Sequence, residues 1–298
     1  MQRAIRTLGQ TGLMVTPLGL GLAALGRPGY INLGHADDFG TDRDIAAATA
    51  RAHAVLDAAH ELGIGYVDVA RSYGRAEEML AGWLRSRSIE PGTIAVGSKW
   101  GYTYTAGWRV DAEHHEVKDH SLATLERQLP ETLALLGPWL GLYQVHSATL
   151  ESGVLDDDAI LDELAARRDR GVAIGLTTSG PGQAHVIRRA LAIERSGAPV
   201  FGVVQATWNV LEPSAEAALA DAHAAGRGVI VKEALANGRL TDRNTALGPA
   251  VRAALASAHD GAASLDQVAL AAALAQEFVD VVLSGAGTVA QLRSNAAA

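Results

Sequence analysis

Four side chains that could transfer protons stand at or just beyond the ends of short apolar runs. They are Asp68, Tyr73, Lys99 and His146. A lysine or an aspartate is costly to bury alone, so we expect Asp68 and Lys99 to pair. A tyrosine near that lysine has its phenolate favoured, which lowers its pKa and makes it a usable general acid. A histidine nearby could orient a carbonyl oxygen. The alternative is an ion pair that serves structure alone.

Such side chains can meet only if the elements before them end at one place. Eight apolar runs predict strands at 17–20, 64–69, 93–98, 141–145, 172–176, 200–205, 228–231 and 279–283. Amphipathic segments predict helices at 44–62, 75–86, 119–136, 157–170, 181–195, 213–225, 249–258 and 264–277, and the last residues could begin another. Eight strand–helix units predict an α/β fold, a closed (β/α)8 TIM barrel, with an open doubly wound sheet as the alternative.

The N-terminal segment RAIRTLGQTGLMVT alternates in polarity around a Gly-Gln-Thr-Gly turn. This pattern predicts a β-hairpin before the barrel, closing its bottom. No linker divides the chain, so we expect one domain over residues 1–298. In a barrel of this kind the active site lies at the carboxyl ends of the strands, where the four side chains stand.

Composition excludes several function classes. The chain has 298 residues, a net charge of -8 and no cysteine. It therefore has no disulfide, thiolate nucleophile or thiolate metal site, and its acidity argues against a nucleic-acid partner. No apolar run is long enough for a membrane helix and no signal-peptide core is present, so we expect a cytoplasmic protein with no membrane partner. Nothing argues for an oligomer, and we expect a monomer.

The loop after the third predicted strand carries histidines and aromatic residues. Adjacent His114 and His115 point apart, and with His120 they form no metal motif, so we expect a solvated loop or pocket rim and no metal. The aromatic residues, which could line a substrate pocket or simply pack on the surface, are Trp100, Tyr102, Tyr104 and Trp108.

In the segments that hold these residues the chain resembles the aldo-keto reductase family. The segments are GIGYVDVARSYGRAEEML, VGSKW, GLYQVH and IGLTTS, and the resemblance runs from RTLGQTGLMVTPLGLGLAALG to GAGTVAQLRSN. It implies an NAD(P)(H)-dependent oxidoreductase that reduces an aldehyde or ketone to an alcohol, or the reverse. By the same resemblance Tyr73 is the general acid, Lys99 lowers its pKa, Asp68 pairs with Lys99 and His146 binds the substrate oxygen. Trp100 and Tyr102 are the expected substrate-binding residues.

The resemblance also implies a nicotinamide dinucleotide lying across the barrel mouth. The matching residues are Gly21, Thr177, Thr178, Gln205, Lys232, Gly285, Gly287, Gln291 and Asn295. Thr178 stands where the family has an asparagine that contacts the carboxamide. Lys232 stands where most relatives stack an aromatic ring on the nicotinamide. As a hypothesis, its ammonium would disfavour the cationic oxidised ring; alternatively, it pairs with Glu233 or another carboxylate.

The loop SGAGT lacks the basic residue that often binds the 2′-phosphate of NADP, and Arg239, Arg243 or Arg293 could replace it. The resemblance implies NADP(H) as the favoured cofactor, because it is the one that the family usually binds, with NAD(H) as the alternative. Two other functions stay open. One is an aldolase that forms a Schiff base on Lys99 or Lys232. The other is a non-catalytic, nicotinamide-binding regulatory subunit.

Overall fold

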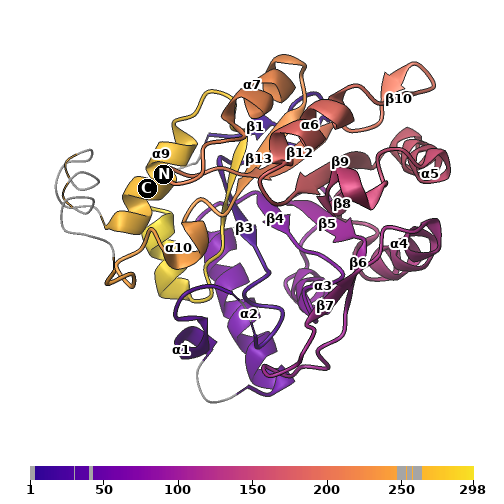
Figure 1. Ribbon diagram of the computed structural model, residues 1–298. Coiled ribbons are helices and arrows are strands. Elements are labelled where there is room, and N and C mark those ends of the chain that lie inside the picture. Colours follow the sequence, from indigo (N-terminus) through magenta and orange to yellow (C-terminus); the bar gives the residue numbers. More distant parts are fainter. Residues whose placement is uncertain (1–3, 30, 40–42, 247–252, 254–256, 258–263) are drawn as a thin grey trace.

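Eight parallel strands close into a barrel in the computed structural model, which describes residues 4–29, 31–39, 43–246, 253, 257 and 264–298 (Figure 1). Their bounds, in order around the barrel, are β3 Leu18–Gly21, β4 Tyr66–Asp68, β5 Ala95–Trp100, β8 Leu140–Ala148, β9 Ala173–Thr178, β12 Val203–Thr207, β13 Gly228–Lys232 and β14 Val281–Ser284. Strand β14 then pairs with β3 and closes the ring. The predicted (β/α)8 barrel is confirmed, and the open doubly wound sheet is wrong.

Helices surround the barrel, as Figure 1 shows. They are α2 Ile45–Glu61, α3 Ala76–Ser86, α4 Leu122–Leu136, α5 Asp158–Asp169, α6 Gln183–Leu191, α7 Glu216–Ala224, α9 Leu265–Leu274 and α10 Val289–Asn295. A short helix α1 (His35–Phe39) and two 3-10 turns (Leu150–Ser152 and Ala236–Gly238) lie in loops. All but two residues of the predicted helix at 249–258 lie outside the described residues.

The predicted helix at 181–195 is too long. Helix α6 ends at Leu191, and the chain then forms a hairpin of β10 (Glu194–Arg195) and β11 (Ala198–Pro199). The two residues between these strands, Ser196 and Gly197, both have positive φ, 55° and 72°. Two successive left-handed residues make a tight turn that suits a two-residue hairpin and cannot continue a helix.

The inward faces of the strands change from apolar to polar along the barrel. An apolar layer, packed on Leu8, consists of Tyr66, Ala95, Leu142, Val203, Ile230 and Val281. Side chains two or four residues further along a strand point the same way. Those positions are occupied by Asp68, Lys99, Gln144, Gln205 and Lys232. The polar side chains of several strands therefore meet one layer above an apolar floor.

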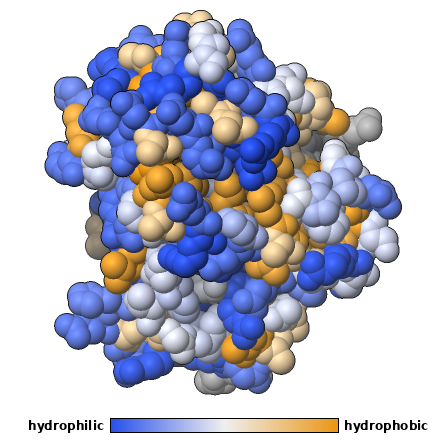
Figure 2. Space-filling view, turned by 90° about the vertical axis from the view of Figure 1, so that its right-hand side faces the viewer, coloured by the Kyte–Doolittle hydropathy of each residue, from blue (hydrophilic) through white to orange (hydrophobic). Residues whose placement is uncertain are grey.

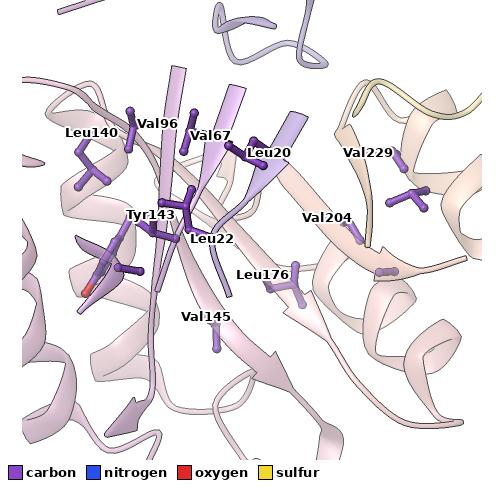
Figure 3. Close-up of a cluster of buried hydrophobic side chains, with 14 of the residues drawn as sticks. Leu20, Leu22, Val67, Val96, Leu140, Tyr143, Val145, Leu176, Val204 and Val229 are labelled. Carbon is purple, nitrogen blue, oxygen red and sulfur yellow. The ribbon is translucent and has the colours of Figure 1, made fainter. Parts of the chain in front are cut away.

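A second apolar layer lies between the strands and the helices. Figure 3 shows part of it, including Leu20, Val67, Val96, Val204 and Val229. All five are at most 2% exposed. This layer fixes the helices on the barrel, because burial of apolar area is the main favourable contribution to folding.

The outer surface is largely polar. On the face that carries α4 and α5, hydrophilic side chains cover most of the surface and hydrophobic ones show between them (Figure 2). Ion pairs join α5 to the segment beyond α6, as between Arg195 and Asp162 at 2.8 Å. Within the described ranges, no helix is both long and apolar enough to cross a membrane.

The predicted N-terminal hairpin is present and packs on the barrel. It pairs β1 (Arg6–Thr7) with β2 (Met14–Val15), and its fully buried Leu8 packs in the apolar floor layer. Gly228, at the start of β13, has room only for hydrogen here, since a Cβ there would lie 2.6 Å from Leu8 Cγ. A backbone bond from Gln10 N to Gly226 O (3.0 Å) holds the turn against the barrel.

We predict that Leu8→Ala lowers the free energy of unfolding by about 2–5 kcal/mol, because it leaves a cavity in the apolar floor. Met14→Ala is the matched control, since Met14 lies in the same hairpin and is 54% exposed. Its effect should stay within about 0.5 kcal/mol. Urea titrations of both variants measure the difference. Equal effects would mean that the hairpin does not seal the barrel.

Candidate active site

A cavity of about 570 Å³ opens at the carboxyl ends of the barrel strands. Sites for small molecules and cofactors have volumes in this range. The predicted site residues on its wall are Gly21, Asp68, Tyr73, His146, Thr177, Gln205, Lys232, Gly285, Gly287, Gln291 and Asn295. Lys99, Trp100, Tyr102 and Thr178 do not line it. The tertiary structure thus brings most of the predicted residues to one place.

The expected pair of Asp68 and Lys99 is present and buried. Lys99 Nζ forms an ion pair with Asp68, and both residues are 1% exposed. The same ammonium donates to the carbonyl of Val69 at 2.9 Å. Asp68 Oδ2 accepts hydrogen bonds from Tyr66 Oη (2.9 Å) and Gln205 Nε2 (3.1 Å). Each buried charge therefore has several partners, which such burial requires.

Tyr73 lies at the cavity end of this network. Its hydroxyl oxygen is 3.4 Å from Lys99 Nζ, and that ammonium is 4.8 Å from the ring centroid. The expected lowering of its pKa is wrong for this structure. Burial, followed by the carboxylate of Asp68, raises the pKa of Tyr73, while Arg27 opposes the rise. The hydroxyl therefore keeps its proton at neutral pH and can donate it.

His146 lies beside Tyr73 with its imidazole neutral. The two rings meet edge to face with centroids 5.4 Å apart, and His146 Nδ1 is 3.4 Å from Ser72 Oγ. Burial, together with the nearby charges of Lys99 and Lys232, lowers the pKa of His146 well below its usual value. A neutral ring can hydrogen-bond a carbonyl oxygen without adding a charge.

Lys232 pairs with Glu233, which is one of the two alternatives that the sequence left open. Its ammonium donates to Glu233 Oε1 at 2.8 Å and to Thr207 Oγ1 at 3.0 Å. Glu233 has a positive φ of 58°, so the chain turns sharply directly after the strand. Lys232 and Glu233 both line the cavity. The pair adds hydrogen-bonding groups to the wall but no net charge.

The predicted residues near α10 form a second hydrogen-bonded group. Gln291 accepts from Gly287 N at 2.8 Å and donates to Asp38 of α1, also at 2.8 Å. Asp38 is ion-paired with Arg243, which follows β13 in the chain. Asn295 is hydrogen-bonded to Ser284 Oγ at 2.9 Å. The α1 loop and the segment after β13 thus meet over this end of the cavity.

Three predicted site residues have other contacts. Trp100 is fully buried in the apolar core, which leaves it no surface on the cavity. Tyr102 stands beside the cavity, its ring 4.9 Å from that of His146. Thr178 is fully buried, and its hydroxyl donates to Gln183 Oε1 at 3.4 Å. The structure therefore does not place Trp100 or Thr178 where a ligand would touch them.

Two residues that the sequence analysis missed form a charged part of the wall. Arg27, 8% exposed, pairs with Glu116 of β7 (Glu116–Lys118) at 3.1 Å. Its guanidinium is 5.5 Å from the ring centroid of Tyr73. Neither residue stands directly at the end of a predicted barrel strand, so no sequence signal marked them. β7 pairs with β6 (Tyr102–Tyr104), so a hairpin after β5 carries Glu116 to the site.

In the part of the chain that the structure describes, no group of three or more His, Cys, Asp or Glu residues could hold a metal ion. His120 differs from the solvated histidine that the sequence suggested. It is 9% exposed, and its Nε2 donates to the carbonyl of His146 at 2.8 Å.

Comparison with known proteins places this chain in one family. The model of the aldo/keto reductase family matches residues 17–298. The pyridoxal 4-dehydrogenase of Microbacterium luteolum is 32% identical over 159 residues, covering 47% of this chain and 42% of that protein. An aldo-keto reductase of Strobilurus tenacellus is 32% identical over 125 residues, covering 41% and 32%. The chain thus matches less than half the length of these curated relatives.

Solved structures agree over nearly the whole chain. A crystal structure assigned to an aldo-keto reductase of Pseudomonas aeruginosa is 25% identical with a TM-score of 0.69, and the match covers 98% of this chain and 93% of that one. The holo form of an aldo-keto reductase from Bacillus halodurans is 22% identical with a TM-score of 0.74, over 99% and 90%. The latter is a likeness of fold.

We predict that acidification destabilises the protein partly through His120. Burial is the main cause that lowers the pKa of His120 from 6.5 to about 4, assisted by Lys118 and opposed by the bond to His146 and by Asp119. Between these values the unfolded chain binds more protons, so the free energy of unfolding falls as the pH drops through this window. The loss from His120 is at most about 3 kcal/mol.

Urea midpoints of the protein and of His120→Gln, measured at steps from pH 7.5 to pH 5, test this. The variant should lose less stability on acidification, because glutamine does not titrate. Parallel curves would show that His120 is not held neutral by burial.

Proposed function

Because this chain belongs to the aldo/keto reductase family, we propose that it reduces an aldehyde or ketone to an alcohol, or catalyses the reverse, with a nicotinamide dinucleotide. One observation carries the proposal. The protonated hydroxyl of Tyr73 lies on the cavity wall within 3.4 Å of the buried Lys99 ammonium, and the neutral His146 ring lies beside it. This arrangement can bind a carbonyl oxygen and give it a proton.

The cavity suits an extended cofactor. It runs from Tyr73 to α10, and glycines at 21, 285 and 287 keep parts of its wall free of side chains. Its far end offers the amide groups of Gln291 and Asn295. A bound nicotinamide dinucleotide would supply the hydride that adds to the carbonyl carbon.

The protein's own residues then handle the proton. The carbonyl oxygen is placed between the Tyr73 hydroxyl and the His146 ring, and negative charge develops on it as the carbon is reduced. Tyr73 gives its proton to that oxygen, which leaves a phenolate beside Lys99. The ammonium stabilises the phenolate, and Asp68 holds the ammonium in place. An alkoxide is a stronger base than a phenolate, so the raised pKa of Tyr73 does not prevent the transfer.

The wall around Tyr73 favours polar substrates. Two ion pairs, Arg27 with Glu116 and Lys232 with Glu233, border the cavity and can hydrogen-bond hydroxyl groups without a net charge. A small carbonyl compound or alcohol that carries further polar groups fits this wall better than an alkyl aldehyde. Because one relative is named for pyridoxal, that aldehyde belongs in the first substrate panel.

The aldolase alternative is less favoured. A Schiff base requires a neutral amine. Lys99 and Lys232 are both engaged in ion pairs with carboxylates, so neither amine is free to attack a carbonyl carbon. The non-catalytic alternative is tested by turnover itself.

We predict that Tyr73→Phe lowers kcat by at least about 100-fold, which is the usual contribution of a general acid. Binding of the reduced cofactor should change little, since the ring remains. The measurement is loss of reduced-nicotinamide absorbance with a panel of polar aldehydes, together with fluorescence titration of the cofactor. Turnover that survives the substitution would contradict the assignment of Tyr73.

The choice between NADP(H) and NAD(H) centres on Arg243. Of the three arginines considered for a 2′-phosphate, Arg293 faces Glu61 on the exposed surface at 3.9 Å, and Arg239 donates to a backbone carbonyl at 3.1 Å. Arg243 lines the cavity but is paired with Asp38. A 2′-phosphate would have to share this guanidinium with a carboxylate, which weakens the expectation of NADP(H) and brings NAD(H) forward.

We predict that Asp38→Asn raises the affinity for NADPH relative to NADH by about tenfold, or about 1.4 kcal/mol, because it frees Arg243 and removes a negative charge. Fluorescence titrations with both cofactors give the ratio of dissociation constants. Asp221→Asn on α7, which breaks an exposed pair with Arg188 of α6, is the matched control and should leave the ratio unchanged. An unchanged ratio in Asp38→Asn would remove Arg243 from cofactor selection.

A further inference from the structure

His120 is a buried histidine that lies outside the cavity but contacts the site. It stands between β7 and α4, and its ring packs edge to face on Trp100 with centroids 5.7 Å apart. Its Nε2 donates to the backbone carbonyl of His146 at 2.8 Å. The side chain of that same residue, His146, faces the substrate end of the cavity.

The bond from His120 falls on an irregularity of β8. The register between β8 and β9 shifts between Val145 and Ala148, and Ser147 has a φ of 52°. A bulge removes the usual ladder partners of the peptide it contains and can re-aim a side chain. Here the carbonyl of the 146–147 peptide accepts from His120, and its N–H donates to Thr177 Oγ1 at 2.7 Å.

The backbone at Gly101 and the start of α4 hold the ring of His120 in place. Gly101, with φ of 104°, lies under the ring, and a Cβ at this position would be 2.2 Å from His120 Cδ2. The neighbouring Asp119 donates its N–H to the carbonyl of Gly101 at 2.9 Å. Ser121 then caps α4 by accepting from Thr124 N at 3.2 Å. The ring therefore has little freedom to turn away from His146.

This arrangement has a cost in stability. Among the described residues, Nδ1 of His120 has no hydrogen-bond partner although it is buried. An unsatisfied buried acceptor is unfavourable, and each such group in a native protein calls for an explanation. An apolar side chain of similar size would avoid the cost but could not hold the carbonyl of His146.

We propose that His120 is a positioning residue for the reaction: its bond to the backbone carbonyl of His146 orients the imidazole that binds the substrate oxygen. The inference rests on the proposed function, because that function places His146 at the substrate oxygen. His120 itself touches neither the cavity nor the reacting atoms. It acts only through the bulge, so its effect depends on the presence of the His146 ring.

A double-mutant cycle tests this dependence. His120→Leu should lower kcat/KM for the carbonyl substrate by about 10- to 100-fold, since small displacements of a substrate-binding group have effects of this size. The dissociation constant of the reduced cofactor should change by less than about twofold. In a His146→Ala background, adding His120→Leu should lower kcat/KM by less than about twofold, because the ring to be oriented is gone.

Further variants separate the bond from packing and from stability. His120→Gln keeps a donor at a similar reach and should recover most of kcat/KM, whereas equal losses in the Gln and Leu variants would overturn the proposal. If His120→Leu does not fold, His120→Met, which also lacks a hydrogen-bond donor, takes its place in the cycle. Asp280→Asn alters a side-chain bond to Val229 N (2.8 Å) remote from the site. It should lower thermal stability and leave kcat/KM unchanged.

The outcomes distinguish this proposal from the one beneath it. Turnover that depends on Tyr73, with His120 and His146 effects that multiply independently, would overturn the positioning role alone. If the unmodified protein shows no turnover, or turnover that Tyr73→Phe leaves intact, both the proposed function and the positioning role of His120 are overturned. If His120→Leu lowers kcat/KM in the otherwise unmodified protein but not in the His146→Ala background, both the proposed function and the positioning role of His120 are supported.

Discussion

The buried pair of Asp68 and Lys99 is the constraint on which the site depends. Two opposite charges, each 1% exposed, are tolerable only if every oxygen and hydrogen around them is satisfied. Tyr66, Gln144 and Gln205 therefore point their polar atoms at Asp68, and Lys99 reaches towards Tyr73. Hydrogen bonding of the ion pair thus draws inward side chains from several strands into one network, and the tyrosine hydroxyl lies at its open end.

The barrel accommodates this buried polar network by placing it one layer above the apolar floor. Side chains alternate along each strand, so an inward apolar residue such as Tyr66 is followed on the same face by a polar one such as Asp68. The N-terminal hairpin covers the opposite end with Leu8. Buried apolar side chains thereby lie below the ion pair, and such low-dielectric surroundings strengthen its electrostatic effect on the groups above it.

Loops complete what the strands begin. The bulge at the end of β8 re-aims His146, and its peptide is held from both sides by Thr177 and His120. The α1 loop and the segment after β13 meet through Asp38 and Arg243 at the far end of the cavity. The site is therefore a polar layer contributed by the strands, with walls contributed by separate loops, and we propose that these walls determine the choice of substrate and cofactor.

The amino-acid sequence by itself determined the barrel strands and the positions of the candidate site residues at their ends. Apolar runs of strand length predicted all eight barrel strands, and the polar residue at each run's end predicted the pairing of Asp68 with Lys99. Local patterns carry this information because the strands of the barrel are parallel, so the last residue of each strand lies at the barrel mouth. Only the tertiary structure decided what surrounds those groups. Arg27 and His120 come from loops, and Glu116 comes from a short hairpin outside the barrel. The pKa of Tyr73 rises rather than falls because burial and Asp68 outweigh Arg27. Burial and through-space charge depend on residues far apart in the chain, which no local pattern records.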